Sequence, residues 1–462
     1  MKKFISLFLI CLMLTAAFPF AVNAADSDFV VENGILLSYR GSYNEITLPS
    51  SVYAVADSAF EGNTTLTSVT IPTSVDEIGN RAFYGCKSLK SVKGGANVSL
   101  VGEFAFNGTP YYDDSEEEFL MLGKTLLWYN GDDMYITLPS CSSIAPYAFL
   151  RCNTAKMVRA SSGLISIGAG AFYDCASIES IDIPSTVSYI GAYAFDGTPF
   201  LSSLGEFPTL GDGILVKYNG NQTHVTVPDG VRRIGSHSFV SSKLISVDIP
   251  DSVFSIDPYA FADCVGLNEI NFSDGLVTIG DGAFRGSRSL SSVATPASLK
   301  YLGQYSFSGS GLNDVRLLGS GLTVSDNAFN NCKEMSYALI SNGVKAVNSG
   351  AFSDCTSLSG ISVPAASDVS FDALSGCDKV TVTTPENSKA SSALSDHTLN
   401  TVIGDADPDG ELNILDATCI QCFTADVLPL EGAQAAACDF DFNGVIDILD
   451  AADVQMTIAE LK

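Results

Sequence analysis

The sequence LTSVTIPTSVDEIGNRAFYGC, residues 66–86, is one complete copy of the unit that decides the fold. Its pattern, L-x-x-V-x-I-P-x-S-V-x-x-I-G-x-x-A-F-x-x-C, recurs along most of the chain, mostly at intervals of 22 or 23 residues. Such self-similarity is typical of a solenoid, because one short unit cannot bury its own apolar face and must stack on its neighbours. The repeats therefore predict an array of coils that share one continuous core.

The aromatic residue of the A-F pair marks each coil. Leu374 takes the same place in ALSGC, so we expect about thirteen coils of 22–23 residues. The L-x-x-V-x-I part alternates apolar and polar residues, which predicts a short strand with its apolar side chains inward. Proline ends this strand, and the I-G-x-x-A-F part is expected to form a tight turn or a short 3-10 segment. The aromatic positions are Phe60, Phe83, Phe106, Phe149, Phe172, Phe195, Phe239, Phe261, Phe284, Phe307, Phe329 and Phe352.

A longer period is visible in the first part of the array. The coils come in threes, and each group begins with a hairpin-like lead-in, which starts at Gly34, Lys124 or Gly213. The gaps before the second and third lead-ins open with the same GTP, at 108–110 and 197–199. We expect these segments to divide the array into groups of three.

The array is expected to end in a cap. Residues 380–397 predict a final strand followed by a short helix that begins at Pro385 or Glu386, and a solenoid needs such a polar end. The polar stretch around 396–403 is then expected to be a short linker.

The repeat pattern resembles the BspA-like leucine-rich repeat family, over residues 29 to about 400. The resemblance implies a β-rich leucine-rich-repeat solenoid for residues 25–400, including its cap. It also implies a secreted or surface protein that takes part in adhesion and protein binding rather than catalysis. It does not name a ligand, because a fold of this kind is a scaffold.

Ligands of such an array are expected at the outward strand positions, since stacking gathers these variable side chains on one face. Trp128, the only tryptophan, occupies a lead-in position that holds Ser38 and Lys217 in the other groups, and it is a candidate for stacking on a sugar. The outward candidates are Glu179, Asp182, Asp248, Asn268, Glu269, Asn271, Asn313, Asp314 and Arg316.

Two acidic loops near the C-terminus form a second motif, DADPDGELNILD at 405–416 and DFDFNGVIDILD at 439–450. Oxygen-bearing side chains stand at loop positions 1, 3, 5, 9 and 12, glycine at position 6, and position 7 offers its backbone carbonyl, as Ca²⁺ with six to eight oxygen ligands requires. We expect two structural Ca²⁺ ions. The predicted ligands are Asp405, Asp407, Asp409, Glu411, Asn413 and Asp416 in the first loop, and Asp439, Asp441, Asn443, Val445, Asp447 and Asp450 in the second.

Both loops end in Asp, where an EF-hand ends in Glu, and each is followed by a helical pattern, with no helix expected to lead into it. Paired loops of this kind resemble the type I dockerin family, over residues 401–462. The resemblance implies a small α-helical module that binds a cohesin module of a cellulosome scaffold in the presence of Ca²⁺. It places partner recognition on Ile414, Leu415 and Gln421 and on the matching Ile448, Leu449 and Gln455, so that two binding orientations are expected; the alternative is that these apolar residues pack inside the module. Pro408 is expected to weaken the first site, because proline restricts its own φ and the residue before it.

The ends and the charge of the chain limit its partners. Lys2, Lys3 and the apolar run from Phe4 to Phe18 predict a signal peptide over 1–24, hence a secreted protein. Its retention at the cell surface or in a cellulosome is what the resemblance to dockerins implies. No other stretch is long and apolar enough to predict a membrane span. The net charge of −28 argues against binding of nucleic acid, because no basic stripe exists to neutralise phosphates.

Few residues of the chain are suited to catalysis, redox chemistry or zinc binding. Seven cysteines follow the repeat aromatic by three residues and are expected to be buried free thiols, with disulfides between neighbouring coils as the alternative. Cys419 and Cys422 form a single CxxC, a weak zinc or redox signal. The three histidines, His224, His237 and His397, are expected to be exposed. The seven cysteines are Cys86, Cys152, Cys175, Cys264, Cys332, Cys355 and Cys377.

The sequence therefore predicts a non-catalytic protein whose dockerin-like module binds cohesin while its array binds a protein, cell-surface or polysaccharide target. Two alternatives stay open. One is an accessory role in polysaccharide degradation through carbohydrate binding, or a cryptic O-glycosyl hydrolase whose carboxylate pair no motif marks. The other is a pure adhesin.

Overall fold

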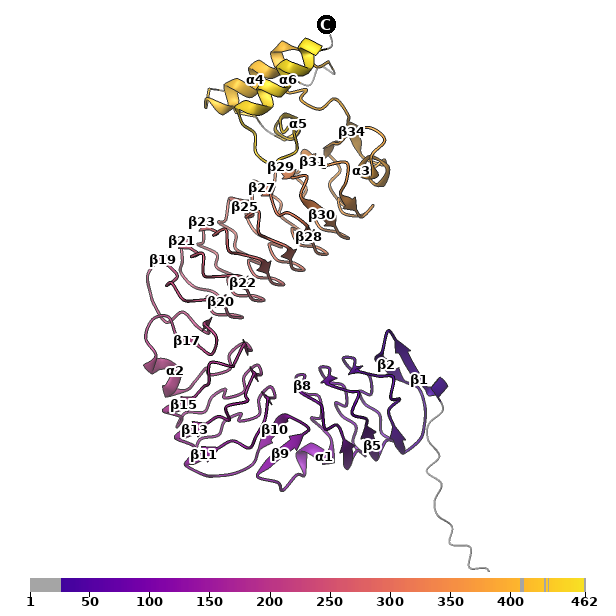
Figure 1. Ribbon diagram of the computed structural model, residues 1–462, viewed down its shortest axis with the longest axis vertical. Coiled ribbons are helices and arrows are strands. Elements are labelled where there is room, and N and C mark those ends of the chain that lie inside the picture. The colour runs from indigo at the N-terminus through magenta and orange to yellow at the C-terminus, as the bar shows by residue number, and fades with distance from the viewer. Residues whose placement is uncertain (1–25, 408–410, 428, 431, 461–462) are drawn as a thin grey trace, which may run out of the picture. The chain divides into compact units, whose positions relative to one another are not determined.

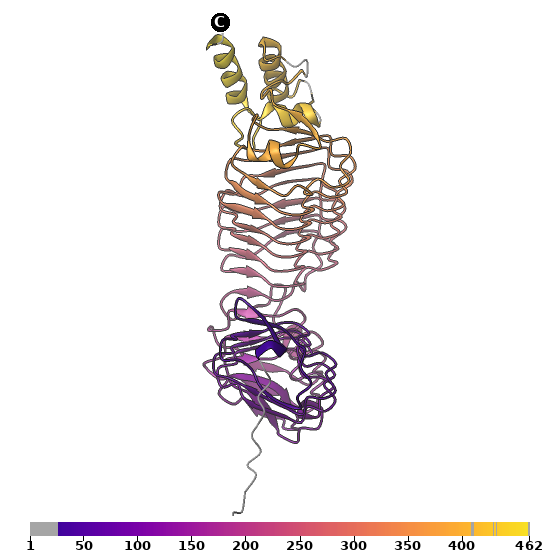
Figure 2. The ribbon, with the colours of Figure 1, turned by 90° about the vertical axis from the view of Figure 1, so that its right-hand side faces the viewer.

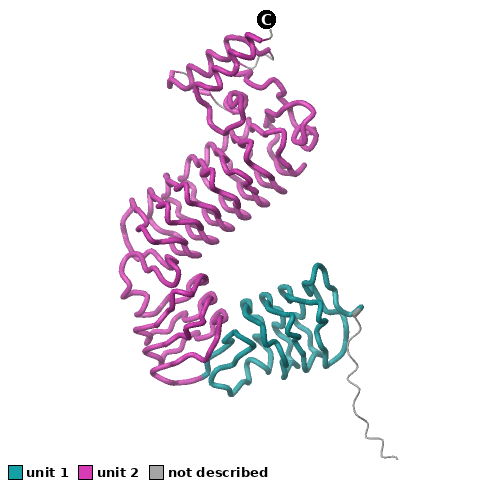
Figure 3. The backbone as a smooth tube through the Cα atoms, in the orientation of Figure 1, with its two compact units in different colours: residues 1–130 teal, residues 131–462 magenta. Residues whose placement is uncertain are grey.

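The computed structural model describes residues 26–407, 411–427, 429–430 and 432–460. The predicted signal peptide, 1–24, lies outside the described residues, as do Pro408, Asp409 and Gly410 of the first acidic loop. The chain forms two compact units, residues 1–130 and 131–462 (Figure 3). Within the described part, no helix is both long and apolar enough to cross a bilayer.

Each coil contributes two short strands, one to each of two sheets. Equivalent strands of successive coils pair in parallel as the coils stack (Figure 2). The first strand is the predicted one, with its middle residue buried and its flanks exposed, as in β11 and β19. The second strand, formed by the residues around the I-G pair, was missed by the sequence analysis, which expected only a turn. Two residues are too few for an alternating pattern, so the sequence carries no periodicity that marks it.

The first strands are regularly registered from coil to coil. In the first unit they are β3 (Glu45–Thr47), β5 (Ser68–Ile71) and β7 (Ser91–Gly94). In the second unit they are β11 (Tyr135–Thr137), β13 (Met157–Arg159), β15 (Ser180–Asp182), β19 (His224–Thr226), β21 (Ser246–Asp248), β23 (Glu269–Asn271), β25 (Ser292–Ala294), β27 (Asp314–Leu317), β29 (Tyr337–Ile340), β31 (Gly360–Ser362) and β33 (Thr381–Thr383).

The second strands form the other side of each coil. In the first unit they are β4 (Ala54–Val55), β6 (Glu77–Ile78) and β8 (Leu100–Val101). In the second unit they are β12 (Ser143–Ile144), β14 (Ser166–Ile167), β16 (Tyr189–Ile190), β20 (Arg233–Ile234), β22 (Ser255–Ile256), β24 (Thr278–Ile279), β26 (Tyr301–Leu302), β28 (Leu322–Val324), β30 (Val344–Val347) and β32 (Asp368–Val369).

The repeat phenylalanines form a stacked ladder inside the array. The rings of Phe261 and Phe284 lie 5.1 Å apart at their centroids and those of Phe284 and Phe307 lie 4.9 Å apart, with interplanar angles of 6° and 10°. The backbone repeats with the rings, because the N–H of Phe261 donates to the carbonyl of Ala283 in the next coil at 2.8 Å. Core and hydrogen bonding thus both run from coil to coil, as the solenoid period predicts.

Each lead-in is itself a coil. Tyr39 stacks on Phe60 at 5.4 Å and Tyr218 stacks on Phe239 at 5.1 Å, so a lead-in tyrosine takes the place of the repeat phenylalanine. The solenoid has about fifteen coils, more than the thirteen predicted from A-F pairs. The tyrosines escaped the prediction because they lack the preceding alanine.

Antiparallel hairpins open the groups of coils, but at a different place from the prediction. Their turns lie at the beginning of each lead-in, around Gly34, Gly123 and Gly211, so the first strand of each hairpin comes before the predicted segment. The hairpins are β1 (Phe29–Glu32) with β2 (Ile35–Tyr39), β9 (Phe119–Leu122) with β10 (Thr125–Tyr129), and β17 (Thr209–Leu210) with β18 (Ile214–Leu215); a 3-10 turn, η1 (Asp26–Asp28), precedes the first.

The GTP segments close a group of three coils. In each, threonine caps a short helix with proline at its first turn, α1 (Pro110–Asp113) and α2 (Pro199–Ser203). The residue after the proline then meets the last repeat ring edge-on, Tyr111 against Phe106 at 67° and Phe200 against Phe195 at 73°. A perpendicular ring ends the stack at both places.

The cap differs in detail from its prediction. Its helix, α3 (Lys389–Ala393), begins after Ser388, whose side chain accepts from the N–H of Ser391, and not at Pro385 or Glu386. The expected linker contains a strand, β34 (Thr398–Asn400), which pairs in parallel with β33 (Figure 1). Serine is a favoured N-cap residue, so the helix begins after Ser388 and not at the earlier proline. A strand of three residues is too short to show an alternating pattern in the sequence.

The C-terminal module follows directly. Helices α4 (Ile414–Thr424) and α6 (Ile448–Glu460) come after the two acidic loops, as expected, and pack on each other (Figure 1). A further helix, α5 (Ala433–Cys438), leads into the second loop, where the sequence analysis expected none. The core of the module contains Ala417, Ile420, Ala451 and Val454, and it also includes Leu339 of the array.

Candidate metal centre and binding surfaces

The two acidic loops are folded around their last aspartate. Asp416 accepts from the backbone N–H groups of Ala406 and Asp407 on one oxygen and from that of Asn413 on the other, at 2.7–3.1 Å. Asp450 repeats this arrangement with the N–H groups of Phe440 and Asp447, each at 2.8 Å. The position-12 carboxylate therefore ties the beginning of each loop to the helix that follows it.

Three carboxylates gather in each loop. Single oxygens of Asp405, Asp407 and Asp416 lie within 4.8 Å of one another, and the same holds for Asp439, Asp441 and Asp450. Within the described residues, these two groups are the candidate metal clusters, and neither includes Cys419 or Cys422. Asp409 lies outside the described residues.

Burial makes the negative charge of these groups costly. Asp416, Asp439 and Asp450 are at most 1 % exposed. Loss of solvation raises the pKa of Asp439 to about 7 and that of Asp450 to about 6, because a buried carboxylate is harder to ionise. A hard divalent cation would relieve this cost, and the all-oxygen donor set fits Ca²⁺ or Mg²⁺ chemistry.

The remaining predicted ligands lie at the edges of these groups. Asn413 and Asp447 accept from the N–H groups of Leu415 and Leu449 and so cap the helices α4 and α6. Asn443 accepts from the N–H of Val445 at 2.7 Å, and its amide donates to Asp441 at 2.9 Å. Glu411 and Val445 were predicted through their backbone carbonyls alone.

The predicted recognition residues are displayed on the outside of the module. Ile414 and Leu415 are both 57 % exposed, and Ile448 and Leu449 are 55 % and 60 % exposed. The alternative, that these side chains pack inside the module, is therefore wrong. Gln421 is half-buried and Gln455 is exposed, at matching places on α4 and α6.

The first-strand face of the array carries the predicted outward residues. Glu179, Asp182, Asp248, Asn268, Glu269, Asn271 and Asn313 are exposed there, while Asp314 and Arg316 are half-buried. Two of the exposed ones are linked along the stack, because the amide of Asn271 donates to Asp248 at 2.7 Å, and the hydroxyl of Thr226 donates to the same carboxylate at 3.2 Å. The result is an acidic, hydrogen-bonded strip.

Trp128 is partly covered. Its ring lies 5.8 Å from that of Tyr112 on α1, and its strand pairs with β9 at Leu120. It remains half-exposed.

An aromatic cleft that the sequence analysis missed lies where the third lead-in begins. The cavity, of about 400 Å³, is lined by Tyr193, His237, Asp196, Lys217 and polar residues of 220–222 and 236–243. The ring of His237 lies between those of Tyr193 and Tyr259, at 4.7 and 5.3 Å. Lys217 pairs with Asp196 at 2.8 Å across the cavity.

Two of the three histidines differ from their prediction. His224 is exposed, but His237 and His397 are half-buried. Burial lowers the pKa of His237, because the charged imidazolium loses solvation. His237 occupies the repeat place that holds tyrosine in neighbouring coils, and comparison of that column would have revealed its stacked environment.

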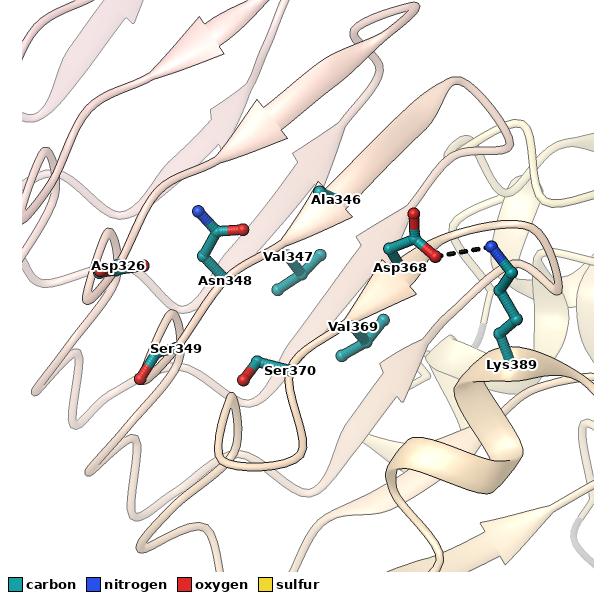
Figure 4. Close-up of a pocket in the computed structure, with 9 residues that line it drawn as sticks. All are labelled: Asp326, Ala346, Val347, Asn348, Ser349, Asp368, Val369, Ser370 and Lys389. Atoms are coloured by element: carbon teal, nitrogen blue, oxygen red, sulfur yellow. Dashed lines mark hydrogen bonds and ion pairs between the residues drawn. The ribbon is translucent and has the colours of Figure 1, made fainter. Parts of the chain in front are cut away.

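A second hollow lies at the C-terminal end of the array, between β30, β32 and α3, with a volume of about 350 Å³ (Figure 4). Lys389 and Asp368 pair across one end at 2.7 Å. The hydroxyls of Ser349 and Ser370 both donate to Asp372 at 2.6 Å. These polar groups already bond to other side chains of the fold, so we assign no ligand site to this hollow.

The repeat cysteines act as internal donors. The buried thiol of Cys86 donates to the carbonyl oxygen of Phe60 in the preceding coil at 3.0 Å, and that of Cys175 donates to Phe149 at 2.8 Å. Cys264, Cys332, Cys355 and Cys377 make the same bond at 3.0–3.2 Å, whereas Cys152 is half-exposed. All cysteines in the described residues are free thiols, and six of the seven repeat cysteines are buried, as expected of them.

Comparison with known proteins identifies the array. A family model described as a BspA type leucine rich repeat region matches in six copies, over residues 37–114, 128–208, 216–336 and 277–394, well over half of the chain. It indicates no catalytic domain, and the residues that it matches end at 394. No curated protein matches the chain significantly.

Several solved structures are similar. A leucine-rich cell surface protein from Faecalibacterium prausnitzii is 26 % identical, covering 76 % of this chain and 97 % of its own, with a TM-score of 0.32. A leucine-rich repeat protein from Eubacterium ventriosum is 21 % identical, covering 75 % and 89 %, with a TM-score of 0.38. The pneumococcal vaccine antigen PcpA is 20 % identical, covering 80 % and 94 %, with a TM-score of 0.35.

Proposed function

Because this chain belongs to the family of BspA-type leucine-rich repeat proteins, we propose that it is a secreted, non-catalytic binding protein carried by a calcium-dependent attachment module. The array would bind a protein, cell-surface or polysaccharide target. Residues 401–462 would bind a cohesin-like module of a scaffold and so place the protein at the cell surface or in a cellulosome.

One observation carries the attachment proposal. The module combines two like groups of three carboxylates, two of them buried in each group, with two like pairs of exposed apolar residues, each pair at the start of the helix that follows a loop. A soluble module gains nothing in stability from four large apolar side chains in water, so their exposure indicates a contact surface. Their duplication supports binding in two orientations.

The buried carboxylates support the calcium proposal. In the first loop, Asp405, Asp407 and Asp416 would hold one ion, and in the second Asp439, Asp441 and Asp450 would hold the other. When bound, the ion supplies positive charge that offsets carboxylate repulsion. The chain itself fixes the loops, since Asp416 and Asp450 keep the backbone in place through the bonds described above.

Calcium and cohesin titrations of the mature chain would test this proposal. Isothermal titration should show two calcium sites, and a panel of cohesins should yield binding that EDTA abolishes. Changing Ile414 and Leu415 to Asp, or Ile448 and Leu449 to Asp, should leave binding through the other pair, whereas all four changes should abolish it. Phe371→Asp, at a residue 75 % exposed on the array, is the control.

The outcomes separate the parts of the proposal. Absence of calcium uptake would overturn the calcium sites. Calcium uptake without binding to any cohesin in the panel would overturn attachment through type I-like recognition. Equal binding by the four-fold variant would overturn the assignment of the Ile-Leu pairs.

A second candidate function, carbohydrate binding by the array, is favoured by the aromatic cleft. Exposed ring faces beside paired charges and hydroxyls suit a sugar, which has both apolar faces and hydroxyl groups. Retention of the chain on insoluble xylan or cellulose should be lost with Tyr193→Ala and kept with Tyr301→Ala, a ring 40 % exposed on β26. Absence of retention on either polysaccharide, with binding to surface proteins, would instead support a pure adhesin.

A further inference from the structure

The outward residues change character near the end of the array. In the registered column of one sheet, Ala294 is followed by Arg316, Leu339 and Ser362. Asp248 and Asn271, at the same strand position of earlier coils, are exposed, but Leu339 and Ser362 are 0 % exposed. The strand around Leu339 is thus apolar on both faces, unlike the alternating strands before it.

The C-terminal module covers this place. Helix α5 contacts strands β29, β31 and β33, and Leu339 lies in the core of the module beside Ala417, Ile420 and Ala435 (Figure 1). Contact at β31 is so close that a Cβ on Gly360 would collide with the carbonyl oxygen of Gly432. A side chain at position 360, such as the tyrosine or aspartate of the two preceding coils, would not fit.

Polar contacts join the array to the second acidic loop itself. The backbone N–H of Asn342 donates to the carbonyl of Phe442 at 2.7 Å, and its side-chain amide donates to the carbonyl of Asp441 at 2.6 Å. The hydroxyl of Ser362 lies 3.5 Å from a carboxylate oxygen of Asp439 and donates to it. The array therefore holds the loop at three of its first four residues.

We propose that Leu339, Asn342, Gly360 and Ser362 form a docking face for the chain's own C-terminal module, and that docking is linked to cation binding in the second loop. The docking part rests on the contacts alone, while the linkage rests on the proposed calcium sites. Because linkage is reciprocal, whatever strengthens one event strengthens the other by the same factor.

The sign of the linkage follows from the contacts. Donors from Asn342 fix the loop backbone in its wrapped form, so a bound ion has less conformational entropy to remove. Docking also keeps Asp439 away from water. A carboxylate that has lost its solvation is stabilised most by a counter-ion. Both effects make the second site tighter when the module is docked. Docking leaves the two Ile-Leu pairs exposed, so it is compatible with partner binding.

Two variants of the full-length mature chain release the module without altering a predicted ligand. Leu339→Arg introduces the residue that the preceding coil already carries as Arg316, and Gly360→Glu introduces the one carried by β23 as Glu269. The array tolerates both residues in equivalent strands. Ala294→Arg is the matched control, at the same column position on the exposed part of the face.

Hydrogen exchange tests docking without any metal. The amides of Asn342 and of residues 440–444 should exchange at least tenfold faster in Leu339→Arg and Gly360→Glu, and unchanged in Ala294→Arg. Calcium titration tests the linkage: one of two sites should weaken about tenfold in the two variants and neither in the control.

Each result has one meaning. Unchanged exchange in both variants would overturn the docking face. Faster exchange with two unchanged calcium affinities would overturn the linkage and leave docking supported. If the wild-type chain takes up no calcium, the proposed function fails at its metal sites and the linkage falls with it, while the exchange result still decides docking.

Discussion

At the scale of the residue, the stacked phenylalanines are the largest fully buried side chains of the array. Phe284→Ala removes a fully buried ring from between two others and should lower the free energy of unfolding by about 3–5 kcal/mol. Denaturant unfolding of the variant measures this. Phe371→Ala, at an exposed ring, should change the free energy of unfolding little, and an equal loss for both would show that the ladder is not a special contributor.

His237 should make the stability of the chain depend on pH. Burial holds its pKa below the ordinary 6.5, so the unfolded chain binds the proton more readily than the folded one. Stability is then fully present above about pH 6.5 and falls as the pH decreases below that value. Its surroundings are the rings of Tyr193 and Tyr259 and the paired Asp196 and Lys217.

The substitution His237→Tyr, which copies the neighbouring coils, should remove this part of the pH dependence. Melting temperatures between pH 5 and pH 8 would measure it, with His224→Tyr at an exposed position as the control. If the slope with pH is the same in both variants, burial of His237 does not govern it.

The thiols make a further prediction about accessibility. Burial raises the pKa of Cys86 to about 11 and that of Cys175 to about 12, and both are hydrogen-bonded, so neither should react with a thiol reagent in the folded chain. Fast modification should be confined to the half-exposed Cys152, Cys419 and Cys422, as peptide mapping after a short pulse would show. Rapid labelling of Cys86 would contradict the burial of the repeat thiols.

At the scale of the element, the acidic loops depend on a residue that accepts on both of its oxygens. Asp450→Asn preserves the shape, but an amide has one acceptor oxygen, so one of the N–H groups of Phe440 and Asp447 loses its partner. The proposed second calcium site should be lost and the module destabilised by about 1–3 kcal/mol. Calorimetry with and without calcium checks both.

Asp378→Asn, an exposed carboxylate of the array, serves as the control for loss of charge alone. Retention of two calcium sites in Asp450→Asn would mean that position 12 is not a ligand. Loss of both sites would instead show that the two loops fold as one unit.

Elements whose sequence pattern recurs in every coil could be predicted from sequence. Short elements without a recurring pattern could not. The first strands repeat a clear alternation in every coil, so their existence and inward faces followed from the pattern. The second strands and β34 are short and pair with strands of neighbouring coils, and α5 is short and packs against the array. Such contacts are invisible to a pattern that describes one segment at a time.

The candidate site shows the same division. The acidic loops could be found because ligand spacing is local, within twelve residues. The docking face could not, because it depends on residues 77 to 100 positions away in sequence from the loop residues that they contact. A signal was present in the unbroken apolar run Ala338–Ile340 and in Gly360, where other coils carry larger residues.

At the scale of the whole molecule, the net charge of −28 should itself oppose folding. Like charges are brought closer in the folded chain, and salt screens their repulsion. The melting temperature should therefore rise as NaCl increases from about 10 to about 150 mM at fixed free calcium. A fall would show that surface ion pairs such as Arg232 with Asp212, at 2.7 Å, outweigh the repulsion.

The terminal strand β34 has a mechanical consequence. It ends at Asn400, and the first clustered carboxylate follows at Asp405, so the connection is at most about 18 Å long when fully extended. If the module is held by a partner while the array is pulled, almost no slack exists to absorb the load. Tension would pass at once to the hydrogen bonds between β33 and β34 and to the docking face. These two sets of contacts would carry the load together.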